Sequence, residues 1–275
     1  MVQDKWAVRL GLGVLCFAAF CSLFPIALLL LNSLKSAREI IISPLAWPME
    51  FRWDNFARAW QDARFDKAIV NSLIIVVLTV FAVCTTASAA AYVLARRLIK
   101  RWQLATIYFL VGTTAPIQLF LFPLYLAYSK LGLINNPFGV ALIYTAIFSP
   151  VAIMLLRTFF IAIPIEVEEA AEIDGANAWQ KFTLVALPIA WPGVLTVALI
   201  VAMNTWNEFV IAATFLQTAE RLTVIGAFFS LSGRYVTDWG EVMAAALIVV
   251  IPIVTLFIFF QRQFIEGMAG GAVKG

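Results

Sequence analysis

Residues 164–188 read PIEVEEAAEIDGANAWQKFTLVALP, and this stretch decides the fold because it is polar while long apolar segments flank it on both sides. It carries five of the chain's 16 acidic residues and a single base, Lys181. So many charges are too costly for the hydrocarbon core of a membrane, so the stretch is predicted to lie in water or against a protein partner. Pro164 suits the start of a helix, the acids that follow favour its first turns, and Gly175 suits its left-handed end.

A second short helix is predicted after Gly175. Trp179, Phe182 and Val185 recur every three residues, which places an apolar ridge on one helical face. Prolines at 188 and 192 then close the unit before the next apolar segment. Residues 164–188 are therefore expected to form two short helices hinged at a glycine.

The composition of the whole chain points to an integral membrane protein. Hydrophobic residues make up 63% of the 275 positions and charged residues 13%, whereas soluble domains are about half apolar. The chain has no histidine, which excludes histidine-based catalysis and metal ligation, and no catalytic or metal-binding residues are expected. Its three cysteines lie in apolar stretches, and its net charge of +3 is too small to indicate a nucleic-acid partner.

Apolar stretches longer than ~18 residues predict membrane-spanning helices, and the chain has six of them. The expected fold is all-α, a single transmembrane domain over residues 1–275. The first stretch lacks a small-residue cleavage site, so we interpret it as a retained span rather than a signal peptide. The predicted spans are residues 10–33, 68–95, 103–128, 138–160, 189–213 and 242–261.

The positive-inside rule gives an expected orientation. The loop after the second span contains RRLIKR, residues 96–101, four bases without an acid, and the N-terminus holds Lys5 and Arg9. Six spans place both on the same side as residues 164–188 and the C-terminus. That side is expected to be the cytoplasm. On the other side, WDNFARAWQDARF, residues 53–65, is expected to contain a surface helix.

The second span contains a run of small residues, AVCTTASAAA at positions 82–91. Small side chains let helix backbones approach closely, so this face is predicted to be a packing seam rather than a ligand site.

Several residues of the 164–188 stretch resemble a known motif. Glu169, Ala170 and Ala171, then Gly175 and, further on, Leu187-Pro188 are similar to the EAA loop of ABC importer permeases. Asp174 before the glycine resembles the carbohydrate-uptake group, while Val185 stands where isoleucine is usual. Asn71-Ser72-Leu73 and Trp206-Asn207-Glu208-Phe209 extend the resemblance to the smaller six-helix permease of maltose-type sugar importers.

The resemblance implies a type I importer architecture, a set of partners and a set of site residues. The partners are a second related permease, a dimer of ATP-binding subunits and an external or periplasmic solute-binding protein, with the chain in the cell inner membrane. No P-loop occurs in the sequence, so ATP and Mg²⁺ are expected on the partner ATPase and no cofactor on this chain. The residues implied to couple the permease to the ATPase are Glu169, Ala170, Ala171, Asp174, Gly175, Leu187 and Pro188.

Glu208 is the acid placed deepest among apolar residues, with Asn204, Trp206 and Asn207 beside it. A carboxylate in a membrane normally faces a protein interior or a wet cavity. An aromatic ring beside amide and carboxyl groups also suits a sugar, because the ring covers its apolar face while the polar atoms bond its hydroxyls. The alternative interpretation is structural, with Glu208 and Asn207 bonded to a neighbouring helix and fixing a gate.

Gln118, beside Pro116 in the third predicted span, is a further candidate for the substrate path. Its alternative role is to bond a carbonyl that the proline leaves free.

The sequence favours a permease subunit that imports a sugar or oligosaccharide without an ATPase site of its own. Glycerol phosphate, a polyol or another small solute stays open as the substrate. A secondary carrier driven by an ion gradient is the rival class, and it would predict further acids or bases in mid-span and inverted repeats.

Overall fold

The computed structural model describes residues 5–232 and 238–272, and the regular structure in these ranges is helical throughout. Two compact units make up the chain. Unit 1 comprises the residues up to 66 together with 227–252, and unit 2 comprises 67–226 and the residues from 253 onward.

Unit 1 is built around Asn55, whose side chain is fully buried. Its amide nitrogen donates to the carbonyls of Ser33, at 2.8 Å, and Lys35, at 2.9 Å. Gly240 approaches the same carbonyl of Lys35 so closely that a Cβ there would lie 2.5 Å from it. The unit contains α1 (Lys5–Ser33), α2 (Ala37–Ile42), the expected surface helix α3 (Asp54–Asp62), the end of α13 (Val224–Ser232) and the first part of α14 (Trp239–Ala272).

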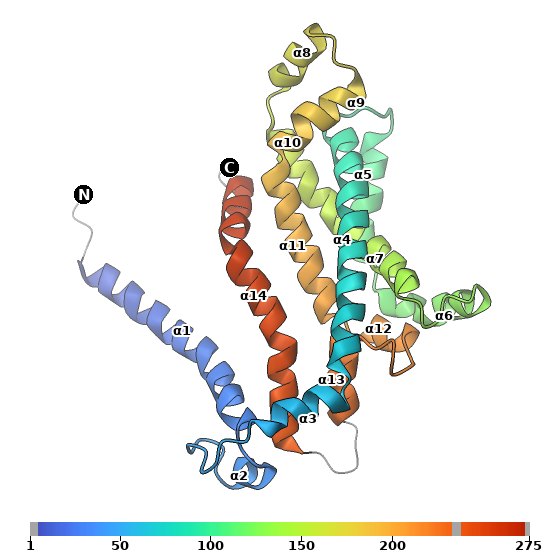
Figure 1. The fold of residues 1–275 in the computed structure, drawn as a ribbon. Helices are drawn as coiled ribbons and strands as arrows, with labels where there is room; N and C mark the ends of the chain where they lie inside the picture. The colour runs from blue at the N-terminus through green and yellow to red at the C-terminus, as the bar shows by residue number, and fades with distance from the viewer. Residues whose placement is uncertain (1–4, 233–237, 273–275) are drawn as a thin grey trace. The chain divides into compact units, whose positions relative to one another are not determined.

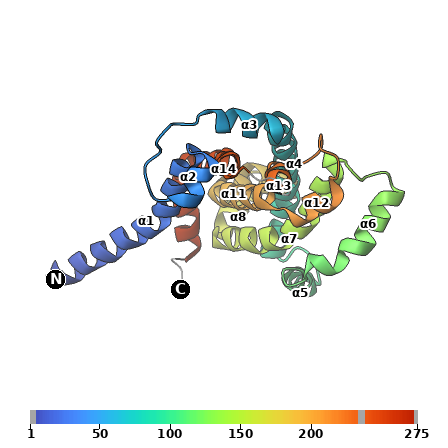
Figure 2. The same cartoon turned by 90° about the horizontal axis from the view of Figure 1, so that it is seen from below.

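Unit 2 has the 164–188 segment at one end, where Figure 1 shows α8 and α9. In both views α6 projects away from α7 and α11 (Figures 1 and 2). Besides parts of α13 and α14, its elements are α4 (Phe65–Ala95), α5 (Trp102–Gly112), η1 (Ile117–Phe120), α6 (Leu121–Lys130), α7 (Pro137–Ala162), α8 (Ile165–Ile173), α9 (Ala178–Gln180), η2 (Lys181–Ala186), α10 (Leu187–Ile189), α11 (Trp191–Asn207) and α12 (Val210–Phe215).

Within the residues that the structure describes, four helices are long and apolar enough to cross a membrane, and the number rises to six if each of two bent helix pairs is one span. The four are α1 from Arg9, α4, α7 and α14 up to Gln261. The bent pairs are α5 with η1 and α6, at 86°, and residues 178–189 with α11, at 74°. The count of six spans therefore depends on how these pairs lie in the bilayer.

The third predicted span, 103–128, is broken in the structure. Pro116 has no backbone N–H, and its ring disfavours helical geometry at Ala115, so α5 does not continue into α6. The hydroxyls of Thr113 and Thr114 bond the carbonyls of Leu110 and Val111 at the broken end. A proline within a predicted span favours a kink, and the structure has a sharper bend of 86° at this point.

The core of unit 2 packs α4 against α7, η2 and α11. Val83, Ala87 and Ala91 of the small-residue run are completely buried in this core, which confirms the predicted packing seam. On the other side of the core, Gly193 lets α11 approach α7 closely, because a Cβ there would lie 2.5 Å from Cγ of Phe159.

Candidate functional site

The 164–188 segment forms the helix, glycine and helix that its sequence predicts. Pro164 is the residue before α8 rather than its first residue, and α8 carries Glu166 and Glu168 in its first turn. Gly175 has φ +88°, in the left-handed region, and a Cβ there would meet no atom within 4 Å. A side chain at Gly175 would therefore have room, but its backbone would be strained.

The second helix begins with a capping box. Asn177 accepts from the backbone N–H of Gln180, and the Gln180 side chain accepts from the backbone N–H of Asn177. The helix then passes through a π-helical turn, η2, into α10 and ends at Ile189, between the two prolines that the sequence predicted to close the unit. Of the predicted ridge, Phe182 is buried, Val185 is half-buried and Trp179 is exposed.

One acid of α8 turns inward, and it is Glu168, with only 4% of its surface exposed. Its Oε2 accepts from the Tyr92 hydroxyl at 2.6 Å. Its Oε1 accepts from Nε of Arg96 at 2.8 Å and lies 2.6 Å from Nη2. Nη2 of Arg96 also donates to the Ile163 carbonyl, at 3.0 Å, directly after α7. We call Tyr92, Arg96 and Glu168 the clamp.

An aromatic cluster lies against the clamp. The Tyr92 ring packs edge-on against Phe160 of α7, with centroids 5.7 Å apart, and 5.1 Å from the Phe182 ring of η2. The clamp and this cluster together connect α4, the end of α7, α8 and η2.

Most of the residues that the family resemblance implies for coupling to the ATPase are exposed. Glu169, Ala170, Asp174 and Gly175 are exposed, and Ala171 is half-exposed. Farther along, Leu187 is half-buried and Pro188 is exposed. The structure thus brings Glu169, Ala170 and Ala171 together on one short helix, directly beside the buried Glu168.

Glu172 and Lys181 form an ion pair across the glycine hinge, at 2.6 Å. The Lys181 ammonium donates a hydrogen bond to Glu172 and attracts its negative charge, which lowers the pKa of that carboxyl below its usual value. The glutamate side chain is 66% exposed, so water weakens the attraction.

Glu208 lies at the opposite end of unit 2, between α11 and α12, and its carboxylate is used internally. The buried Tyr144 hydroxyl donates to Oε2 at 2.6 Å. The backbone N–H groups of Ile211 and Ala212, at the start of α12, donate to the same carboxylate at 3.1 and 3.2 Å. The fifth predicted span, 189–213, is interrupted here, since α11 ends at Asn207 and α12 begins at Val210. The Glu208 carboxylate accepts from N–H groups in the first turn of α12, which have no partner within that helix. This geometry favours the structural interpretation of Glu208.

The other substrate-path candidates do not gather around Glu208. Trp206 is buried, whereas Asn204 and Asn207 are exposed and donate to the carbonyls of Ile200 and Met203 in their own helix. Gln118 is exposed in η1, beyond the break at Pro116. Asn204 lines a small cavity of about 90 Å³ between α7 and α11.

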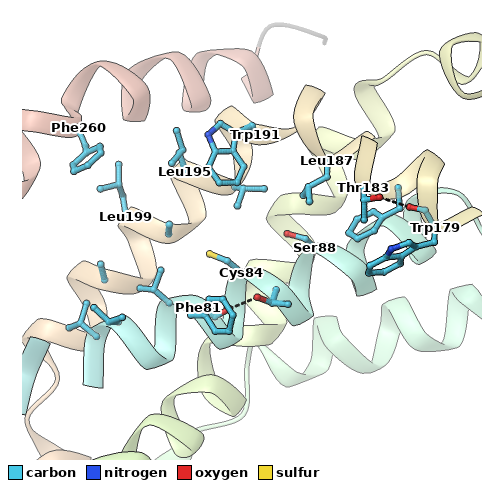
Figure 3. A pocket seen from close by; sticks show the side chains of 18 residues that line it. Phe81, Cys84, Ser88, Trp179, Thr183, Leu187, Trp191, Leu195, Leu199 and Phe260 are labelled. Carbon is cyan, nitrogen blue, oxygen red and sulfur yellow. Dashed lines mark hydrogen bonds between the residues drawn. The ribbon is translucent and has the colours of Figure 1, made fainter. Parts of the chain in front are cut away.

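A much larger cavity of about 730 Å³ lies between α4, α11 and the second half of the 164–188 segment (Figure 3). Its wall is apolar apart from a few small groups such as Ser88, Thr85 and Thr183. The two threonine hydroxyls already donate to backbone carbonyls of their own helices. Such a wall offers few partners for the hydroxyls of a sugar and suits apolar chains or another helix.

Sequence reasoning missed the clamp and the anchoring role of Asn71. The Asn71 amide donates to the carbonyls of Glu220 and Leu222, and Ser72 Oγ accepts from the N–H of Val224, so both hold the segment before α13. The sequence showed Glu168 as one of the five acids of residues 164–188 and predicted no separate role for it. A helical projection of α8 would have placed it three positions before Ala171, on the more buried face.

Comparisons with known proteins agree with this fold. Residues 87–270 match the family described as binding-protein-dependent transport system inner membrane component. The diacetylchitobiose uptake system permease protein NgcG of Streptomyces coelicolor is 34% identical over 274 residues, covering 99% of this chain and 91% of its own. The trehalose transport system permease protein SugB of Mycobacterium tuberculosis is 31% identical, covering 92% and 93%.

A solved structure also matches the fold. It is the crystal structure of a bacterial ABC transporter involved in the import of the acidic polysaccharide alginate. The TM-score is 0.78 at 22% sequence identity, and the match covers 96% of this chain and 98% of the other.

Proposed function

Because the chain belongs to the family of binding-protein-dependent transport system inner membrane components, we propose that its 164–188 segment docks on a separate ATP-hydrolysing subunit. The chain is a multi-pass permease subunit of an ABC importer, and we propose a sugar or oligosaccharide as its substrate. The observation that carries the docking proposal is that Glu169 and Ala170 of α8 are exposed while Glu168 of the same helix is buried.

The physical case for docking rests on shape and charge. Ala170 and Ala171 give α8 a narrow surface that fits a cleft, and Glu169 offers a carboxylate to a basic group of the partner. The clamp holds the other side of the helix, so that α8 does not have to become ordered when it binds. A preorganised surface binds more tightly because less conformational entropy is lost.

The substrate proposal is supported by what the relatives are named for, which is uptake of diacetylchitobiose and trehalose. The apolar cavity in Figure 3 has too few polar groups for a sugar, which favours a path shared with a second permease. We further propose that ATP and Mg²⁺ bind the partner ATPase and that an external binding protein delivers the solute. The inner membrane is the proposed location, with both chain ends in the cytoplasm.

An ion-coupled carrier is not favoured. A carrier of that kind needs an acid free to bind the coupling ion, and Glu208 already accepts hydrogen bonds from a tyrosine and two backbone amides.

Ala170→Trp tests the docking site, because Ala170 is exposed and a tryptophan there leaves the fold of the segment intact. We expect the complex to lose the ATPase, or to hydrolyse ATP without responding to the loaded binding protein, since overpacking a tight contact costs about 1–3 kcal/mol. Gly175→Val should have the same effect through backbone strain, and Gly175→Asn a weaker one, because asparagine tolerates the left-handed region.

The measurement is co-purification of the ATPase with each variant, followed by ATP turnover and uptake of labelled trehalose, diacetylchitobiose and longer oligosaccharides. Leu131→Trp, at a residue 70% exposed and outside the segment, is the control and should keep the ATPase. Normal retention and stimulation in Ala170→Trp would contradict docking at this face. A working complex that takes up none of the sugars would contradict the substrate class alone.

A further inference from the structure

We propose that Arg96 is a positioning residue that makes α4 move together with α8, through its ion pair with Glu168. This inference rests on the proposed function, because the ion pair has a role in transport only if the ATPase moves α8. The movement of α8 would then reach the membrane-spanning helices through Arg96.

The covalent chain alone would carry the movement into other helices. α8 continues from α7 through Ile163 and Pro164, and it leads through α9, η2 and α10 into α11. α4 lies far away in sequence, with Arg96 and Glu168 72 residues apart. Side-chain contacts must therefore carry any movement from α8 into α4, and the clamp supplies them.

The geometry of the clamp makes it a stiff connection. The guanidinium contacts Oε1 of Glu168 with both Nε and Nη2, and the Tyr92 hydroxyl occupies the other oxygen. Two contacts from a planar group resist rotation as well as separation. The side chains of Arg96 and Glu168 are only 10% and 5% exposed, so water screens the attraction much less than at the surface.

Arg96 also fixes the joint at which α7 becomes α8. Its Nη2 donates to the carbonyl of Ile163, the residue that ends α7. One guanidinium thus bonds to the end of α7 and to α8 while its own backbone follows the last turn of α4, with the Arg96 N–H donating to the Tyr92 carbonyl. A change in the angle between α7 and α8 would have to break these bonds or carry α4 along.

The docking face lies on the same short helix. Glu169 and Ala170 are exposed directly after the buried Glu168, so a load applied to them reaches the clamp across the width of one helix. The sequence also contains a matched control. Arg97, the next residue, is exposed, and its guanidinium lies over the ring of Trp102, 4.7 Å from its centroid.

The test compares Arg96→Gln with Arg97→Gln, which remove the same charge from adjacent positions. Both are made in the complete importer complex after Cys16, Cys21 and Cys84 are changed to serine. Spin labels are placed at Leu98 and Ile173, which are 58% and 87% exposed. Leu98 reports on α4, because its N–H bonds the Val93 carbonyl, and Ile173 is the last residue of α8.

The distance between the labels is measured without nucleotide and with ATP and vanadate, so the readout needs no transported sugar. We expect one narrow distribution, the same in both states, for the unsubstituted complex and for Arg97→Gln. In Arg96→Gln the distribution should broaden and shift when nucleotide binds. ATP turnover should continue, while most of its stimulation by the loaded binding protein should be lost, because α4 no longer follows α8.

A merely structural role for Arg96 would lower the amount of complex without changing this nucleotide response. If Arg96→Gln does not assemble, Tyr92→Phe removes one bond of the clamp, keeps the ring contacts and should show a smaller shift. Equal nucleotide-dependent shifts in Arg96→Gln, Arg97→Gln and the unsubstituted complex would overturn the clamp inference alone. A complex that never binds the ATPase would overturn the proposed function instead.

Discussion

Two glutamates of unit 2 show two ways to hold a carboxylate inside an apolar protein. Glu168 and Glu208 each accept a 2.6 Å hydrogen bond from a tyrosine hydroxyl, of Tyr92 and Tyr144 respectively. Glu168 is then paired with a cation, Arg96, whereas Glu208 bonds the backbone N–H groups of Ile211 and Ala212. Among the side chains that the structure describes, none forms an ion pair with Glu208.

The two kinds of partner have different effects on the helices around them. An ion pair joins two side chains from elements distant in sequence, so it can transmit a force between helices. A carboxylate on backbone N–H groups fixes the place where a helix starts, within a few residues of itself. We infer that Glu168 connects moving parts and that Glu208 holds a fixed break.

The largest expected effect comes from removing the carboxylate of the ion pair. Glu168→Leu leaves the Arg96 guanidinium buried without its counter-charge, which typically costs 3–5 kcal/mol, so about that much of the free energy of unfolding should be lost. The double variant with Arg96→Leu should recover part of the loss, because replacing both partners of a buried pair by apolar groups is often neutral. The remainder is the cost of the Tyr92 hydroxyl, which stays without its acceptor.

Unfolding of the purified permease by SDS in mixed micelles measures this loss. Glu169→Leu is the control, since Glu169 is adjacent but exposed, and it should change stability by no more than about 0.5 kcal/mol. A loss in Glu168→Leu as small as that of the control would show that the ion pair is not a structural link.

Glu208→Leu leaves the Tyr144 hydroxyl and two backbone N–H groups without their acceptor, and each buried donor that finds no new partner costs about 1–3 kcal/mol. The two glutamates should differ in whether removing the partner side chain restores stability. Tyr144→Phe removes one stranded donor but leaves the N–H groups of Ile211 and Ala212 unpaired, so the double variant should stay destabilised. Glu208→Gln should lie in between, because its amide oxygen still accepts.

The same SDS unfolding measures these variants, with Asn207→Leu as the control at an exposed position that bonds only within its own helix. Full recovery of stability in the double variant of Glu208 and Tyr144 would mean that the backbone N–H groups contribute nothing. The two glutamates would then be equivalent, and the comparison would fail.

The sequence predicted the class of the fold because apolar length and helical periodicity are local properties. It also predicted the glycine hinge, since φ +88° at Gly175 is a conformation that glycine adopts freely. It did not predict that Glu168 is the acid of EEAA that turns inward, because Glu168 and Glu169 have the same chemistry. A helical projection separates their faces but does not identify the partners that meet the inward one, which are Tyr92 and Arg96. It treated Pro116 as a kink, but the bend of 86° depends on how residues 117–130 pack.

The smallest expected effect is at the exposed ion pair of Glu172 and Lys181, which tests whether burial gives the clamp its strength. Both pairs have an N to O distance of 2.6 Å, so distance alone would make them equal. Because Glu172 is 66% exposed, Glu172→Gln should leave the SDS unfolding of the permease at neutral pH within error of the unsubstituted chain.

Lys181 lowers the pKa of Glu172, so the folded state holds its proton less tightly than the unfolded chain does. Whatever stability the pair contributes is therefore present above the ordinary glutamate pKa of about 4.3 and is lost as the pH falls through the lower, folded value. The small difference between Glu172→Gln and the unsubstituted chain should vanish over that acidic range. A loss at neutral pH as large as that of Glu168→Leu would show that distance, and not exclusion of water, decides the strength of these ion pairs.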